Sequence, residues 1–283
     1  MLKRLVGLCG SVIVAGIDRF RAAIRGLLGL PARSTCVVLA YHAVAPRERT
    51  RFARQMDDVL RLSKPVPADL VDIPQDGGRY VAITFDDGLE NIIENALPEL
   101  KVRKIPATLF IVTDVLGKRP AWEYFGGADP ANERAMTEQQ LRDLDTDYLL
   151  IGSHSATHPV LPALDDQELG REIVGSRSKL ESLLNREVKL LSFPYGYFDQ
   201  RVINRCRDAN YVRVFTALPV LAMTTPREFV TGRVGVNPTD WPIEFRLKLA
   251  GAYRWLPYAY SLKRKLLGLL RGQPAAPLGL KTT

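Results

Sequence analysis

The sequence has little cysteine, little histidine and no apolar run long enough to cross a membrane. Its three cysteines, Cys9, Cys36 and Cys206, are an odd number without the paired spacing of a zinc site, which excludes a disulfide framework and a cysteine-ligated metal. The uncharged stretches Leu5 to Ile17 and Val214 to Pro226 are thirteen residues long, whereas a spanning helix needs ~20. We therefore expect no membrane span, and structural thiols of a reducing compartment.

The N-terminus has one feature of a signal peptide but not the others. Lys3 and Arg4 precede an apolar stretch with the length of a signal-peptide h-region. The residues that follow, IDRFRAAIRGLLGL, offer no clean small-residue cleavage site. We therefore favour a protein that stays in the cytoplasm or on the cytoplasmic face of the inner membrane over one with a cleaved signal.

Positive charge is concentrated at the two ends of the chain. Of a net charge of +8, residues 1–34 carry six basic residues against Asp18, and residues 246–283 carry eight basic residues and no acidic one. The segment between them is net acidic, which argues against a nucleic-acid groove across the fold and for ends that meet an anionic surface.

Both ends have the composition of segments that lie in a membrane interface. Apolar residues from Ile17 to Leu28 fall on one helical face, with Arg19 and Arg21 mainly off it. The tail adds aromatic residues beside Lys263, Arg264 and Lys265. We predict peripheral binding to an anionic membrane, the alternative being helices that pack on the body of the protein with their charges in solvent.

Short apolar runs alternate with helical patterns along the middle of the chain. Continuous rather than alternating apolarity indicates strands buried on both faces, as in a parallel sheet. Seven runs qualify: 36–41, 80–85, 107–112, 148–153, 188–193, 212–217 and 229–236. Apolar residues at helical spacing lie between them, as in Phe52, Met56, Val59 and Leu60. The pattern predicts an α/β barrel or a doubly wound sheet at 35–245, flanked by a basic segment at 1–34 and a helical tail at 246–283.

Polar residues follow these runs at the carboxyl ends, where such folds place their chemistry. Asp86 and Asp87 follow the second run, and the only three histidines, His42, His154 and His158, follow two others. A carboxylate and two imidazoles suit a divalent ion such as Zn²⁺ and leave positions open for water and substrate. Each alone has a plainer explanation, a turn or helix cap for the aspartates and packing for the histidines.

Three short motifs in this set resemble those of the polysaccharide deacetylase family, which contains the NodB homology domain. They are TFDDG at 84–88, SHSATHP at 153–159 and SFPYG at 192–196. The resemblance implies a distorted (β/α)7 barrel and metal-dependent hydrolysis of N-acetyl groups on amino sugars. It further implies that Asp87, His154 and His158 hold the metal and that Asp86 is the general base. In SFPYG, Pro194 and Tyr195 would meet the substrate, and the Tyr195 backbone N–H would bind the oxyanion.

The chain departs from the family pattern in two places. The family's third motif usually begins with an arginine that tethers the catalytic aspartate, and here Ser192 stands in its place. Arg233 is the candidate substitute, the alternative being a surface salt bridge. The usual late Leu-x-His motif is absent, but LAYHAV at 39–44 resembles the first motif of a permuted branch found in exopolysaccharide deacetylases, which makes His42 the general acid.

The resulting prediction is a metal-dependent N-deacetylase acting on an N-acetylated amino sugar, in a polysaccharide or a lipid-linked glycan. A catalytically silent carbohydrate-binding relative is the alternative. An Fe(II) oxygenase could use the same ligands, but its double-stranded β-helix does not suit the alternating pattern. The connection at 117–140, rich in glycine, proline and alanine, is either a substrate-covering loop or partly disordered.

Overall fold

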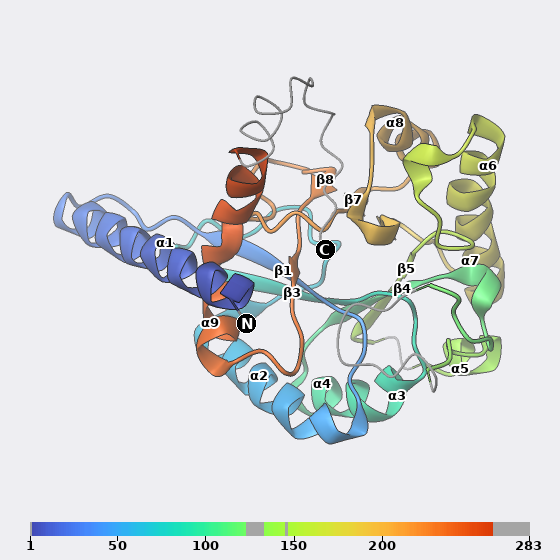
Figure 1. Cartoon of the computed structure of the whole chain (residues 1–283), viewed down its shortest axis with the longest axis horizontal. Coiled ribbons are helices and arrows are strands. Elements are labelled where there is room, and N and C mark those ends of the chain that lie inside the picture. Colours follow the sequence, from blue (N-terminus) through green and yellow to red (C-terminus); the bar gives the residue numbers. More distant parts are fainter. Residues whose placement is uncertain (1, 123–132, 145–146, 263–283) are drawn as a thin grey trace.

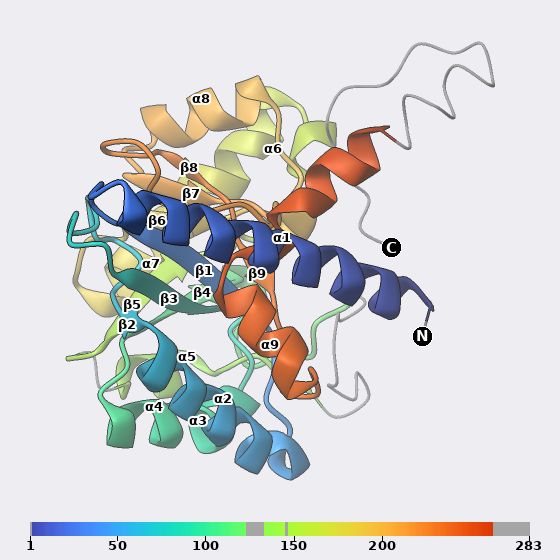
Figure 2. The same cartoon turned by 90° about the vertical axis from the view of Figure 1, so that its left-hand side faces the viewer.

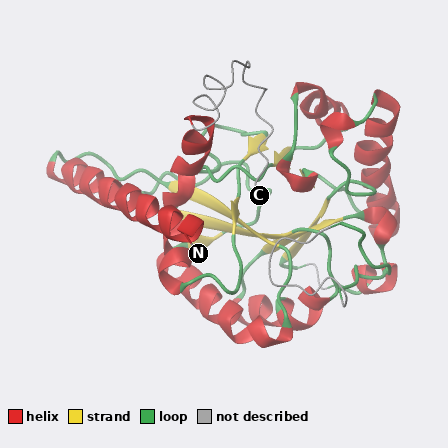
Figure 3. Ribbon diagram, viewed as in Figure 1, coloured by secondary structure: helices red, strands yellow, loops and turns green. Residues whose placement is uncertain are grey.

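The computed structural model describes residues 2–122, 133–144 and 147–262, and shows a curled parallel sheet surrounded by helices (Figures 1 and 3). Every paired strand is parallel to its neighbour. The strands are β1 (Thr35–Tyr41), β2 (Lys64–Pro65), β3 (Arg79–Phe85), β4 (Ala107–Ile111), β5 (Leu149–Ser153), β6 (Leu190–Ser192), β7 (Arg213–Phe215), β8 (Val230–Thr231) and β9 (Val234–Gly235). All seven predicted strands are present.

A single stretch of chain forms both edges of this sheet. The strand order is β8-β7-β6-β5-β4-β3-β1-β9, with β2 beside β3. Only Gly232 and Arg233 separate β8 from β9, so the predicted strand 229–236 pairs with β7 at its start and with β1 at its end. The sheet therefore curls into the expected distorted barrel, and β1 lies between β3 and the last strand.

Helices cover the outside of the barrel (Figure 1). In α2, the predicted residues Phe52, Met56 and Val59 are buried, whereas Leu60 is 45% exposed. The helices of the body are α2 (Arg49–Leu62), α3 (Asn91–Asn95), α4 (Leu97–Arg103), α5 (Glu138–Arg142), α6 (Asp166–Gly170), α7 (Ser176–Leu184), α8 (Gln200–Asp208) and α9 (Pro242–Leu249). A π-helical turn, η4 (Arg171–Gly175), joins α6 to α7.

Alternate residues of each strand face two different cores. One set packs outward against the helices, as Val37, Leu39 and Tyr41 do in β1. The other set fills the barrel, as Cys36 and Val38 do in the same strand. Strand side chains alternate with period two, and residues 42 and 86 continue the inward set of β1 and β3. The barrel register therefore predicts that His42 and Asp86 point into its mouth.

The N-terminal helix α1 (Leu2–Leu27) packs against α9 and against the chain that follows α9 (Figure 2). Trp255 in the short helix η6 (Ala252–Trp255) donates its indole N–H to Ser11 at 3.1 Å, and Gly10 leaves room for that ring. The predicted boundary between 245 and 246 falls inside α9, and the remainder of the tail, 263–283, lies outside the described residues. Within the described ranges, no helix combines the length and apolar character that a bilayer span requires.

The barrel interior has no room for an added methyl group at Gly152. A Cβ at this residue of β5 would lie 2.5 Å from the Phe110 ring and 2.9 Å from the Leu190 carbonyl oxygen. We predict that Gly152→Ala lowers the free energy of unfolding by about 1–3 kcal/mol, the usual effect of overpacking.

Urea denaturation provides the measurement, with Gly16→Ala as the matched control. Gly16 lies in α1 with no atom within 4 Å of an added Cβ, so its substitution should instead stabilise by up to about 1 kcal/mol through helix propensity. Equal effects at the two positions would contradict the packing argument.

Candidate active site

A pocket of about 500 Å³ opens at the carboxyl ends of the strands. It brings together seven of the residues singled out in the sequence: His42, Asp86, Asp87, His154, His158, Tyr195 and Arg233. The eighth, Pro194, is buried, and the residues on either side of it, Phe193 and Tyr195, line the pocket. Residues distant in sequence thus meet because parallel strands end at one edge of the barrel.

Asp86 forms a buried ion pair with Arg233. The guanidinium donates to both carboxylate oxygens at 2.7 Å, and Asp86 and Arg233 are 4% and 2% exposed. Burial alone would raise the pKa of Asp86, but the charge of Arg233, with smaller effects of nearby histidines, holds that pKa well below its usual range. Asp86 is therefore an ionised carboxylate held in one orientation.

Arg233 reaches this position from the junction between β8 and β9. It also donates to the Ser192 hydroxyl at 2.7 Å, to the Thr84 hydroxyl at 3.1 Å and to the Thr216 carbonyl at 3.3 Å. Ser192, which stands where the family motif usually has arginine, thus contacts the guanidinium that comes from another strand. The alternative of a surface salt bridge is wrong because both partners are buried.

Asp87 turns into the same pocket through its backbone. A regular strand would aim it away from Asp86, but its φ of 68° lies in the left-handed region, which a non-glycine residue rarely adopts. Burial raises the pKa of Asp87, an effect that His42 and His154 oppose and Asp86 reinforces. Its Oδ1 atom is buried and has no hydrogen-bond partner among the described residues. Such an atom indicates a partner of another kind, such as a cation.

Both histidines of the SHSATHP motif point a ring nitrogen at this oxygen. The Nε2 atoms of His154 and His158 lie 3.7 and 3.5 Å from Asp87 Oδ1. His154 Nδ1 lies 2.8 Å from the Ser192 carbonyl, which can only accept, so Nδ1 carries a proton and Nε2 is the ring nitrogen that faces Asp87. Burial is the main cause that lowers the pKa of His158 to about 2, so its ring is neutral.

These three residues fit a divalent cation. One ligand atom from each lies within 4.8 Å of the others, and all three side chains are buried. In a tetrahedral site with ligands 2.0–2.1 Å from the ion, ligand atoms are about 3.4 Å apart, close to the distances from Asp87 to the histidines. The imidazole orientation set by a backbone carbonyl is the usual support of such a site.

The turn between the two histidines depends on Glu172, which the sequence did not single out. Its carboxylate accepts from the backbone N–H groups of Ala156 and Thr157 at 2.8 and 2.9 Å and from the Thr157 hydroxyl at 2.6 Å. Glu172 belongs to the π-helical turn η4, a feature that often marks functional sites. No local sequence pattern indicates this contact, because it forms only when the segment that contains η4 and α7 packs on the barrel.

Two parts of the pocket wall were also unexpected. Trp122 stacks on the His158 ring, with centroids 4.2 Å apart. Trp122 belongs to the connection at 117–140, for which a substrate-covering loop was one of the two predictions. Residues 123–132 of this connection lie outside the described residues. The opposite wall comes from α9 and the chain after it, through Glu244, Lys248, Tyr253, Leu256, Pro257 and Tyr260. Part of the predicted tail therefore shapes the pocket.

Comparison with known proteins agrees with this geometry. The polysaccharide deacetylase family model matches residues 74–214, which include Asp86, Asp87, His154 and His158 but neither His42 nor Arg233. The Bacillus subtilis protein YxkH, whose name places it among the polysaccharide deacetylases, is 22% identical over 213 residues, 71% of each chain. The poly-beta-1,6-N-acetyl-D-glucosamine N-deacetylase of Staphylococcus aureus is 30% identical over 122 residues, 42% of this chain and 41% of that enzyme.

Solved structures share the fold. IcaB from Ammonifex degensii superposes with a TM-score of 0.63 and 23% identity, covering 79% of this chain and 98% of IcaB. The deacetylase PplD of Streptococcus pyogenes has a TM-score of 0.62 and 17% identity, covering 77% of this chain and 99% of PplD. With its matched motifs, its parallel barrel and its buried aspartate and histidine cluster, this chain belongs to the polysaccharide deacetylase family.

Proposed function

We propose that this protein is a metal-dependent N-deacetylase that hydrolyses the acetamide of an N-acetylated amino sugar in a glycan. One observation carries the proposal: the ionised, arginine-bound Asp86 lies in the same pocket as the Asp87, His154 and His158 cluster. A complete set of this kind argues against a catalytically silent carbohydrate-binding relative. The named activity of the staphylococcal relative supports a polymer of N-acetylglucosamine as the substrate class.

Asp86 is the proposed general base. Its carboxylate is ionised and aimed by two hydrogen bonds from Arg233, so it can accept a proton from water in the pocket without first reorienting. The same guanidinium makes Asp86 a weak base. Asp87, His154 and His158 would hold a divalent ion, expected to be Zn²⁺, which would acidify water and polarise the acetyl carbonyl and so compensate for the weak basicity of Asp86.

His42 and Tyr195 are the residues proposed to complete the reaction. The leaving amine must be protonated before the C–N bond breaks, and His42 lines the pocket beside Asp86 at the end of β1. Tyr195 adopts the left-handed backbone conformation, with φ of 57°, at the pocket wall. We assign its N–H to the developing oxyanion, an interaction worth about 3–4 kcal/mol when well placed.

The metal assignment predicts two distinct classes of variant. Asp87→Ala, His154→Ala and His158→Ala should each lose bound metal and activity together, because each removes one of the three ligands that the described residues offer. Asp86→Asn should keep the metal and lose turnover. Metal content of the purified proteins, measured beside acetate release, tests both. A metal-free Asp86 variant and a metal-replete Asp87 variant would reverse the two roles.

The acid assignment predicts that His42→Ala folds, retains metal and lowers kcat by roughly 10² to 10⁴, the range for loss of a general acid. It should also flatten the alkaline limb of the pH–rate profile, since the proton donated to the amine no longer comes from an imidazolium. Acetate release from an N-acetylglucosamine oligomer across pH provides the measurement. Wild-type rates on this amide substrate would rule out His42 as the acid.

The buried ion pair predicts that a variant without the Arg233 guanidinium is much less stable than the wild type. Arg233→Met should lower the free energy of unfolding by about 3–5 kcal/mol, because it leaves a buried carboxylate unpaired. Arg246→Met is the control: Arg246 is 47% exposed and pairs with Asp58 at the surface, so its loss should cost less than about 1 kcal/mol. Similar unfolding curves for the two variants would show that Asp86 does not depend on Arg233.

A further inference from the structure

Helix α1 presents an apolar face that no described part of the protein covers. The face consists of Val6, Ile13, Ile17, Phe20, Ile24 and Leu27, which recur at helical spacing and are 39–87% exposed. Ten of the twenty exposed large apolar side chains in the described residues lie between Leu5 and Leu30. Apolar surface gathered in this way, rather than scattered singly, marks an interaction site.

The opposite face of α1 is already occupied by the protein. Ser11 is fully buried beneath Trp255, and Arg4 donates to Glu244 at 2.6 Å and lies 4.3 Å from the Trp241 ring. Asp18, the only acidic residue of the helix, pairs with Arg254. The helix is therefore docked along one side. Most of its apolar face is exposed, and Ile17 lies at the edge of that face, where it also lines a pocket.

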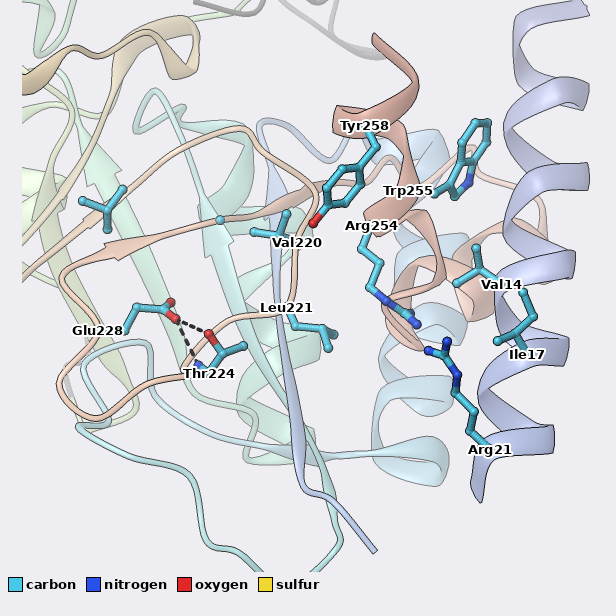
Figure 4. Close-up of a pocket in the computed structure, with 12 residues that line it drawn as sticks. Val14, Ile17, Arg21, Val220, Leu221, Thr224, Glu228, Arg254, Trp255 and Tyr258 are labelled. Atoms are coloured by element: carbon cyan, nitrogen blue, oxygen red, sulfur yellow. Dashed lines mark hydrogen bonds between the residues drawn. The ribbon is translucent and has the colours of Figure 1, made fainter. Parts of the chain in front are cut away.

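A second pocket lies where α1 meets the chain after α9. It has a volume of about 520 Å³ and is lined by apolar side chains, by Arg21 and Arg254, and by Glu228, whose carboxylate accepts hydrogen bonds from Thr224. The guanidinium groups of Arg21 and Arg254 point toward each other at its mouth, with Val14 and Ile17 beside them (Figure 4). Asp18 offsets one of these two positive charges. The remaining positive charge next to apolar walls suits an anion that is attached to an apolar group.

We propose that the apolar face of α1 lies in the interface of an anionic lipid bilayer, with Arg21 and Arg254 binding a lipid phosphate. The positive charge of α1 favours an anionic bilayer over a second copy of the chain as the partner. Arg19, Arg21 and Arg25 flank the apolar face, and the helix has no acidic residue other than the paired Asp18. A second copy of the chain would bring like charges together, whereas anionic headgroups would meet each of these arginines with opposite charge. This proposal does not depend on the proposed deacetylase activity of the pocket that contains Asp86.

Sedimentation with lipid vesicles tests the apolar contact. The full-length protein should sediment with vesicles of mixed phosphatidylcholine and phosphatidylglycerol at low salt, less so at high salt, and remain in solution with phosphatidylcholine alone. The double variant Ile13→Ser and Phe20→Ser should bind the anionic vesicles at least about tenfold more weakly, because both side chains then no longer bury apolar area. The control is Val102→Ser, at an 81% exposed residue of α4, which should bind like the wild type.

A second pair of variants tests the contribution of positive charge to vesicle binding. Arg21→Gln should weaken binding to anionic vesicles by about fivefold, the effect of one basic residue near such a surface. Arg51→Gln, at an exposed arginine of α2, should leave binding unchanged. All four variants should unfold at the wild-type temperature, since the substituted side chains are exposed.

Three results would overturn the proposal. One is a wild-type protein that stays in solution with anionic vesicles at low salt. Another is a dimer in light scattering that the Ile13→Ser and Phe20→Ser variant dissociates, which would assign the apolar face to a second copy. The third is equal vesicle binding by Arg21→Gln and the wild type, which would remove the headgroup site. None of these results changes acetate release from a soluble oligomer, so a failure here is separate from a failure of the proposed function.

Discussion

The buried ion pair between Asp86 and Arg233 constrains both the barrel and its site. A guanidinium in a barrel interior is stable only when its donors are satisfied, and Arg233 achieves this with groups from β3, β6 and the residue after β7. It stands at the junction where the sheet's two edges meet, and its guanidinium lies over the packed rings of Phe110 and Phe215. The residue that closes the barrel is thus the one that orients the proposed base.

Several residues of the pocket that contains this ion pair have a strained backbone conformation. Asp87, Ser155, His158 and Tyr195 all have positive φ, a conformation that costs energy for residues with a side chain. The surrounding hydrogen bonds hold it in place: Glu172 fixes the turn after Ser155, and the Ser155 hydroxyl accepts the His158 N–H at 3.0 Å. A cation site needs ligands that point at one position, as Asp87, His154 and His158 do. The end of a regular strand cannot direct neighbouring residues in this way.

Helix α1 and the segment after α9 are connected to the proposed active site. Glu244 and Lys248 line the proposed active site, and Glu244 also pairs with Arg4 of α1. The segment that follows α9 contributes Tyr253 to the pocket and Trp255 to the contact with α1. Helix α1 is therefore linked to the pocket through Glu244 and through the segment that holds Tyr253 and Trp255.

The sequence by itself determined the strands and their parallel arrangement and, through motifs that resemble those of a known family, the barrel and the cluster of Asp87, His154 and His158. Continuous apolar runs and short motifs are local properties of a chain. It also indicated Arg233 and His42 as candidates. Only the tertiary structure decided that Arg233 reaches Asp86, that Glu172 holds the histidine turn and that residues after 246 line the pocket. Those contacts join segments far apart in sequence, and they depend on barrel register and helix packing, which no local pattern records.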